Sequence, residues 1–154
     1  MKVCVYAICK NESQFVDRFM DSMSEADYVC VLDTGSSDDT VKKLRARGAI
    51  VGETVVSPWR FDTARNRSLE LVPEDADLCV CTDLDEVFRP GWRTAMEQAL
   101  AGGAEKLRYR YTWSFRPDGR EGVVFWIEKA HARFGFRWAH PLHEVLECTK
   151  GACR

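Results

Sequence analysis

Residues 78–86 read Leu-Cys-Val-Cys-Thr-Asp-Leu-Asp-Glu, and this stretch decides the fold class. An apolar run leads directly into three carboxylates, those of Asp83, Asp85 and Glu86. A near-continuous apolar run is typical of a central parallel strand that is covered on both faces. In an open α/β sheet, ligands bind beyond the carboxyl ends of such strands. The stretch therefore predicts a parallel sheet with acidic side chains along one edge.

Strand and helix patterns alternate through the first two-thirds of the chain. Strands are expected at residues 2–8, 28–32, 49–56 and 78–82, and helices at residues 13–23, 39–47, 63–71 and 92–100. Ser13 and Asp62 are the expected N-caps of two of these helices. Alternating residues then predict strands at 107–113 and 123–127 around a turn at residues 117–119, and shorter ones at 130–134 and 145–148. The order predicts one α/β domain over residues 1–154, with a mixed, mainly parallel central sheet and a C-terminal antiparallel part.

Composition excludes several classes of protein. Apolar residues make up 45% of the 154 residues and charged residues 30%, which excludes a disordered chain. The formal net charge of −2 is not the basic footprint of a nucleic-acid binder. No apolar run approaches the roughly 18 residues of a transmembrane segment. The seven cysteines are odd in number and form no C-x-x-C pair, so reduced thiols and a cytoplasmic location are expected.

Polar side chains follow three of the expected parallel strands. Asn11 and Glu12 come after the first strand, Asp33 after the second, and Asp83 and Asp85 after the fourth. The carboxyl ends of parallel strands meet at one edge of a sheet, so these side chains are expected to converge. Each one alone is more often a cap or a turn residue, but their convergence predicts a binding site.

The pair Asp83-x-Asp85 points to a metal ion. Two adjacent carboxylates repel each other, and a site that keeps both ionised usually supplies a cation. Oxygen ligands favour Mg²⁺ or Mn²⁺, with substrate phosphates completing the coordination. The same spacing also occurs by chance in many chains.

Two further groups are candidates for the same site. In the segment 140–144, Pro141 excludes a helix, and His143 is expected as a nitrogen ligand that would favour Mn²⁺; His140 is the alternative. Arg65, followed by Asn66 near a helix start, is a candidate phosphate contact. The competing interpretations are a histidine satisfied by a backbone group and a solvated arginine.

These motifs together resemble family 2 glycosyltransferases. The matching segments are 7–12, 31–40, 64–66, 83–86 and 143–144, in the order seen in that family. The resemblance implies a GT-A fold, a nucleotide-diphosphate sugar donor, a divalent cation and inversion at the anomeric carbon. It maps the D-x-D motif onto Asp83 and Asp85, and a nucleoside contact onto Asp33. The acceptor-side extension is nearly absent, which would make this an unusually short member.

The expected function is metal-dependent transfer of a sugar, from a UDP-sugar for preference, to a hydroxyl of a glycan, lipid or protein. Asn11, Glu12, Asp33, Arg65 and Asp83 are the expected contacts of the nucleotide sugar. Asp83, Asp85 and His143 are the expected ligands of Mn²⁺ or Mg²⁺. The family's general base has no clear match; Glu144 is the first choice, and Asp118 and Glu128 are the alternatives.

Two other functions stay open at this level. One is a non-catalytic or partner-dependent module that binds a sugar nucleotide. The other is a nucleotidyltransferase, which the lack of glycine after the first strand disfavours. Trp113, Trp126 and Trp138 are candidates for stacking on an acceptor sugar, although core packing is the commoner use of tryptophan.

Overall fold

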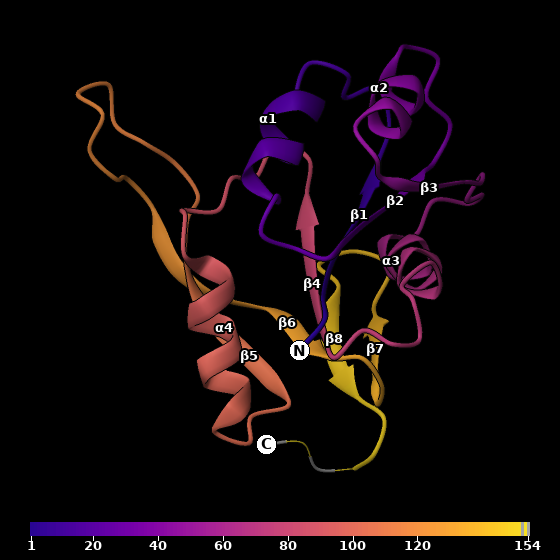
Figure 1. Cartoon of the computed structure of the whole chain (residues 1–154). Helices are drawn as coiled ribbons and strands as arrows, with labels where there is room; N and C mark the ends of the chain where they lie inside the picture. The colour runs from indigo at the N-terminus through magenta and orange to yellow at the C-terminus, as the bar shows by residue number, and fades with distance from the viewer. Residues whose placement is uncertain (152, 154) are drawn as a thin grey trace.

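The computed structural model describes residues 1–151 and 153 of the chain (Figure 1). Four strands and four helices alternate in its first part and antiparallel strands follow, as the sequence patterns predict. The elements are β1 (Val3–Cys9), α1 (Val16–Ser22), β2 (Tyr28–Asp33), α2 (Thr40–Ala46), β3 (Ile50–Glu53), α3 (Phe61–Glu70), β4 (Leu78–Asp83), α4 (Trp92–Ala101), β5 (Lys106–Thr112), β6 (Val124–Ala132), β7 (Phe136–Ala139) and β8 (Val145–Cys148).

The central sheet has six strands in the order β3-β2-β1-β4-β6-β5. The first four are parallel, whereas β6 pairs antiparallel with β4 and β5 antiparallel with β6. In register, Ile8 lies opposite Asp83 and Cys9 opposite Asp33. The ends of β1, β2 and β4 therefore meet at one edge, and the predicted mixed, mainly parallel sheet is confirmed.

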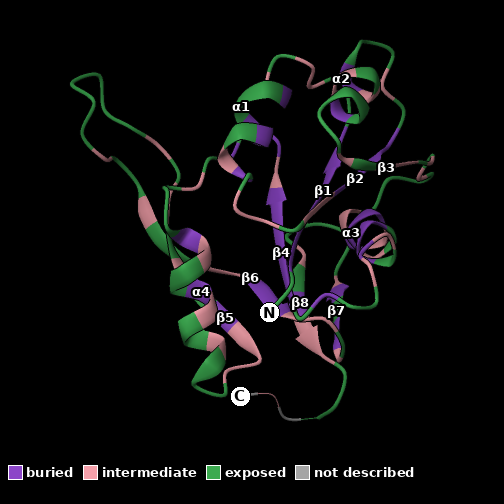
Figure 2. Ribbon diagram, in the orientation of Figure 1, coloured by how far each residue is buried: buried purple, intermediate pink, exposed green. Residues whose placement is uncertain are grey.

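The sheet is covered on both faces. One face packs against α1, α2 and α4, and the other against α3 and the separate two-stranded sheet β7–β8. Every residue of β1 is buried, as its all-apolar sequence predicts for a central strand (Figure 2).

A buried polar chain joins the small sheet to the large one. The Trp138 Nε1–H donates to the Tyr6 hydroxyl over 2.8 Å, and Tyr6 lies 2.8 Å from Nε2 of His131. The other ring nitrogen of His131 lies 2.8 Å from the Ala132 carbonyl. With Nδ1 carrying the proton, every group in the chain is satisfied. Burial lowers the pKa of His131 to about 4, so the ring is neutral at pH 7.

Several local predictions are wrong. Ser13 does not cap α1: the cap residue is Phe15 without a side-chain bond, and the Ser13 amide donates to Asp38. Asp62 lies within the first turn of α3 rather than before it. The strands predicted at 123–127 and 130–134 are one strand, β6, and the short β7 was not predicted. Helix and strand ends depend on tertiary contacts that local patterns do not contain.

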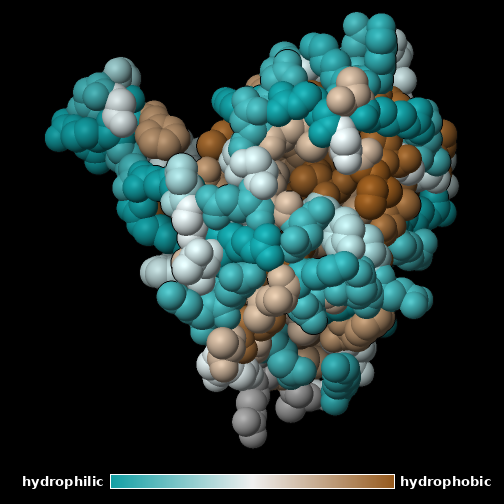
Figure 3. Space-filling model, in the orientation of Figure 1, coloured by the Kyte–Doolittle hydropathy of each residue, from teal (hydrophilic) through white to brown (hydrophobic). Residues whose placement is uncertain are grey.

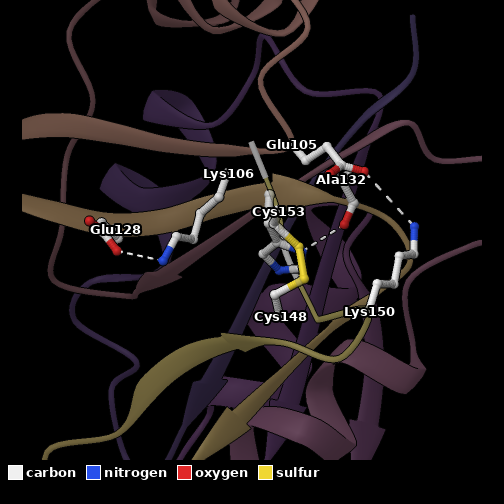
Figure 4. Close-up of a disulfide and its surroundings, with 8 residues drawn as sticks. Glu105, Lys106, Glu128, Ala132, Cys148, Lys150 and Cys153 are labelled. Atoms are coloured by element: carbon white, nitrogen blue, oxygen red, sulfur yellow. Dashed lines mark hydrogen bonds and ion pairs between the residues drawn. A yellow bond between two sulfur atoms is a disulfide. The ribbon is translucent and has the colours of Figure 1, made fainter.

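The expectation that all cysteines are reduced is also wrong. Cys148, at the end of β8, and Cys153 form a disulfide with their Cα atoms 6.1 Å apart (Figure 4). Their separation of five residues is no recognised pairing motif, so nothing in the sequence predicted the pair. Among the described residues the remaining five cysteines are free and buried, and all of them lie within β1, β2 and β4.

None of the helices in residues 1–151 and 153 is both long enough and apolar enough to cross a bilayer.

Candidate functional site

Arg65 of α3 lies at the centre of the site. Its side chain is only 4% exposed, and its Nη2 donates to Oδ1 of Asp83 over 2.6 Å. Its Nε donates to Oε1 of Glu144 over 3.2 Å, and its Nη1 to the Thr82 carbonyl over 3.2 Å. One buried guanidinium thus joins the end of β4 to Glu144, the residue directly before β8. Arg65 is not the solvated arginine of the competing interpretation.

Asp83 has a second cationic partner that sequence reasoning missed. The Lys129 ammonium of β6 lies 3.2 Å from Oδ2 of Asp83 and 2.9 Å from Oε1 of Glu86. The other oxygen of Glu86 accepts a hydrogen bond from the Thr82 hydroxyl over 2.7 Å. Burial opposes the charge of Asp83, yet Arg65 and Lys129 hold the pKa of Asp83 below its usual value. No sequence motif marks Lys129 as a site residue. The alternating pattern around it indicates a strand, but it does not tell which side chain of that strand meets Asp83.

Asp85 is the carboxylate that remains available. It is exposed beyond the end of β4, and its backbone carbonyl accepts a 2.9 Å hydrogen bond from Arg18. In the described part of the chain, no donor contacts the Asp85 side chain. Burial raises the pKa of Glu12 to about 7, and the charges of Asp85 and Asp83 act in the same direction. The carboxylate of Asp85 is thus left without a described cationic partner where β4 ends.

Asp33, the last residue of β2, is more enclosed than its place at the edge of the sheet predicts. It is 2% exposed, and its Oδ1 accepts hydrogen bonds from the amides of Gly35 and Ser36 over 2.9 and 2.8 Å. The Ser36 hydroxyl donates to the other oxygen. Burial works against the charge, but these donors hold the pKa of Asp33 below its usual value. The carboxylate thus shapes the loop after β2 instead of facing an open cleft.

Asn11 holds the same loop from the other side. Its side-chain carbonyl accepts hydrogen bonds from the amides of Ser37 and Asp38 over 2.7 and 3.3 Å, and its own amide donates to Ser36. Its φ of 54° lies in the left-handed region that asparagine tolerates. Asn11 and Asp33 together fix a loop beside the carboxylates.

The segment 140–144 reaches the site through Glu144 rather than His143. The Pro141 carbonyl accepts a 3.0 Å hydrogen bond from the amide of Phe61, at the start of α3, so this helix anchors the bend that Pro141 makes. His143 is exposed with a φ of 54°, and His140 is exposed and 3.9 Å from Glu147. The bend therefore delivers the Glu144 side chain to Arg65.

The three residues expected to bind the metal do not form a ready-made cage. Within residues 1–151 and 153, no group of three or more His, Cys, Asp or Glu side chains is arranged to hold an ion. Both oxygens of Asp83 are engaged by Arg65 and Lys129. Asp85 is the expected ligand whose carboxylate is unengaged in the described structure.

The alternative general bases lie in ion pairs elsewhere. A hydrogen bond from Arg120 lowers the pKa of Asp118, at the far turn of the β5–β6 hairpin. Hydrogen bonds from Lys106 and Arg108 lower the pKa of Glu128. Neither carboxylate contacts the Arg65 cluster, whereas Glu144 does.

A hollow of about 890 Å³ opens beside Asp85, on the side away from β1 and β2. Its walls are the loop after β4, helix α4 and strand β5, and we refer to it as the α4–β5 hollow. Trp113 and Trp126 line it and are 66% and 63% exposed, whereas Trp138 is buried in the core. The hairpin that carries Trp113 stands away from the body of the molecule (Figure 3).

No protein-family model matches this chain, and no curated protein matches it in sequence. Solved structures do match. Glucosyl-3-phosphoglycerate synthase from Mycobacterium tuberculosis aligns over 86% of this chain and 58% of its own, with a TM-score of 0.61 and 24% identity. The same enzyme in complex with Mg²⁺ and UDP aligns over 68% of this chain and 42% of its own, with a TM-score of 0.56 and 27% identity. TarS from S. aureus aligns over 69% of this chain and 21% of its own, with a TM-score of 0.57 and 19% identity.

These structures share the GT-A fold of glycosyltransferases, and the fold of this chain is the same. The resemblance to family 2 glycosyltransferases that the sequence motifs carry is thereby confirmed. The chain spans less than two-thirds of the length of each of these solved structures.

Proposed function

We propose that this chain carries the donor site of a metal-dependent, inverting glycosyltransferase that uses a UDP-sugar. The observation that carries the proposal is the Arg65 cluster, in which one buried guanidinium holds Asp83 and Glu144 at the carboxyl edge of the sheet, next to the unengaged carboxylate of Asp85. A glycosyltransferase structure that aligns at 27% identity contains UDP and Mg²⁺, which supports the choice of nucleotide and cation.

The side chains fit a divalent cation of the Mg²⁺ or Mn²⁺ type. Such ions are bound through one or two carboxylates, while substrate phosphates and waters supply the other ligands. Asp85 meets this need, because its exposed carboxylate has no donor among the described residues. We assign Asp85 as the main protein ligand and leave His143 out, because the segment 140–144 reaches the site through Glu144 and leaves His143 exposed. Bound there, the ion would act as a Lewis acid toward the diphosphate.

The remaining donor contacts follow from the arrangement of the loops. The loop that Asn11 and Asp33 hold lies where the nucleoside would bind, with Glu12 beside it. Asp83 is fixed by Arg65 and Lys129 and would contact the ribose. These two cations are themselves paired with Asp83, Glu144 and Glu86, so the charge that develops on the leaving diphosphate falls to the divalent cation.

In the transfer itself, the acceptor oxygen forms a bond to the anomeric carbon of the sugar. The bond from that carbon to the diphosphate oxygen breaks, and its electron pair leaves with UDP. The hydroxyl proton of the acceptor passes to a carboxylate, for which we propose Glu144. Its Oε1 accepts a hydrogen bond from Nε of Arg65, which orients the carboxylate at the edge of the sheet.

Calorimetric titration of the chain with UDP tests the donor site. UDP is expected to bind in the presence of Mg²⁺ or Mn²⁺ and to bind at least about tenfold more weakly in EDTA, because the cation links Asp85 to the diphosphate. Asp85→Asn should remove this dependence on the metal. Asp39→Asn is the matched control, since Asp39 is exposed at the start of α2 and makes no capping bond. Equal UDP affinity in EDTA would refute the metal-bridged site.

Release of UDP from UDP-sugars separates the enzyme from a binding module. An active transferase, given an acceptor, releases UDP in the presence of Mn²⁺, whereas a pure binder does not. A nucleotidyltransferase would instead release pyrophosphate from a nucleoside triphosphate and a sugar 1-phosphate.

A further inference from the structure

The α4–β5 hollow has a fixed relation to the donor residues. Strand order puts β1 and β2 on one side of β4, and β6 and β5 on the other. The expected nucleoside contacts, Asn11 and Asp33, lie on the first side, and the hollow opens on the second with Asp85 in its wall. A molecule in the hollow would therefore meet the donor at Asp85.

Aromatic side chains line the outer part of the hollow. Trp113, Phe115 and Trp126 are each more than 60% exposed, although burying such rings is normally favourable. Tryptophan in particular has a large apolar face with a polar N–H at its edge, which suits a partner that is itself part apolar and part hydroxylated. Sugar rings have this character, because their C–H groups lie on one face and their hydroxyls around the rim.

The charges of the hollow favour an anion. Four arginines line it, and two of them are neutralised: Arg108 pairs with Glu128 at 2.7 Å and Arg110 with Glu121 at 2.5 Å. Arg89 is 87% exposed, with its nearest carboxylate 3.8 Å away. Arg18 donates to a backbone carbonyl, and no described carboxylate pairs with it.

The acidic groups of the hollow do not balance these two arginines. Glu86 is bound by Lys129 and Thr82 and so is already compensated. Asp85 is the other acidic side chain in the wall, and under the proposed function it binds the divalent cation. Two guanidinium groups therefore remain for a ligand near the point of transfer.

We propose that the α4–β5 hollow is the acceptor site and takes a saccharide that carries an anionic group, a phosphate or a carboxylate. The rings stack on Trp113 and Trp126, and the anion is bound by Arg89 and Arg18. The assignment of the hollow as an acceptor site rests on the proposed function. Binding of an anionic sugar to the hollow can be measured independently of that function.

The experiment is an NMR titration of the ¹⁵N-labelled chain with four probes: glucose 6-phosphate, glucuronate, glucose and inorganic phosphate. Each titration is carried out with and without saturating UDP and Mg²⁺. Glucose 6-phosphate or glucuronate should shift the indole N–H signals of Trp113 and Trp126 and leave that of the buried Trp138 unchanged. The stronger of the two identifies the anionic group, and glucose and inorganic phosphate should each bind several-fold more weakly because each offers half of the contacts.

Two pairs of variants test the assignment. Arg89→Ala should weaken binding of the stronger anionic sugar by about fivefold or more, whereas Arg116→Ala, in the β5–β6 hairpin and outside the hollow, should not. Trp126→Ala should weaken binding of the anionic sugar and of glucose alike, whereas Trp59→Ala, at an exposed tryptophan distant in sequence and outside the hollow, should leave both unchanged.

Failure of this inference is distinct from failure of the proposed function. If UDP binds with Mg²⁺ but no probe shifts the signals of Trp113 or Trp126, the acceptor assignment is wrong and the donor site stands. Equal weakening by Arg89→Ala and Arg116→Ala would also overturn it, since that result reflects general charge. If UDP fails to bind, the proposed function is wrong, whatever the sugars do.

Discussion

The guanidinium of Arg65 lies 2.6 Å from the carboxylate of Asp83 and is almost fully buried beneath it. The pair joins the third helix to the end of the fourth strand, and Glu144 and Lys129 complete a cluster of alternating charges around it. A buried ion pair gains little net stability, but breaking one leaves an uncompensated charge. The cluster therefore fixes the geometry of the site more than it stabilises the fold.

Arg65→Ala is expected to lower the free energy of unfolding by about 3–5 kcal/mol, because Asp83 and Glu144 would lose their shared partner. Urea denaturation measures the change. Arg67→Ala is the matched control: Arg67 is exposed on the same helix, and its loss should cost about 1 kcal/mol or less. Adding Asp83→Asn and Glu144→Gln to Arg65→Ala should recover part of the loss. Similar values for Arg65→Ala and Arg67→Ala would show that the cluster is not effectively buried.

Tyr6→Phe and Tyr109→Phe remove the same hydroxyl from two buried rings with opposite expectations. The Tyr6 hydroxyl joins Trp138 to His131, so its loss leaves two buried groups unpaired and should cost about 2–4 kcal/mol. The Tyr109 hydroxyl is buried and has no hydrogen-bond partner among the described residues, so its loss should cost less than about 1 kcal/mol or stabilise the protein. Equal losses in urea denaturation would contradict the polar chain through Tyr6.

The neutral His131 should make stability depend on pH. Its pKa is about 4 in the folded protein and about 6.5 in the unfolded chain, so between these values the unfolded chain binds more protons. Stability should therefore fall as pH drops from 6.5 to 4, by up to about 3 kcal/mol for this group.

Glu12 acts in the opposite sense over an overlapping range. Its folded pKa of about 7 lies above its ordinary value of 4.5, so its contribution is lost as pH rises toward 7. The measurement is best made in the Glu12→Gln background, by urea denaturation at pH values from 4 to 7.5. A flat profile in that variant would mean that His131 is protonated in the native state.

Asp33 should affect both stability and nucleotide binding, and two substitutions separate the effects. Asp33→Ala removes the acceptor of the Gly35 and Ser36 amides and should cost about 1–3 kcal/mol. Asp33→Asn keeps one acceptor oxygen, so it should remain within about 1 kcal/mol of the parent while binding UDP more weakly. If Asp33→Asn binds UDP as tightly as the parent in calorimetry, Asp33 is not a nucleoside contact and serves the loop alone.

The sequence by itself determined the order of the main elements and the edge at which polar side chains gather. These follow from local periodicity and from the rule that parallel strands end on one side, so the apolar run at residues 78–82 leading into Asp83 was sufficient. Tertiary structure decided which of those side chains are free. Lys129 and Glu144 reach Asp83 and Arg65 only after β6 pairs with β4 and β8 pairs with β7, and no local pattern contains such long-range contacts. For the same reason only the folded chain could show that Asp33 is enclosed by its loop, that Asp85 remains exposed, and that Trp113 and Trp126 line a hollow while Trp138 is buried in the core.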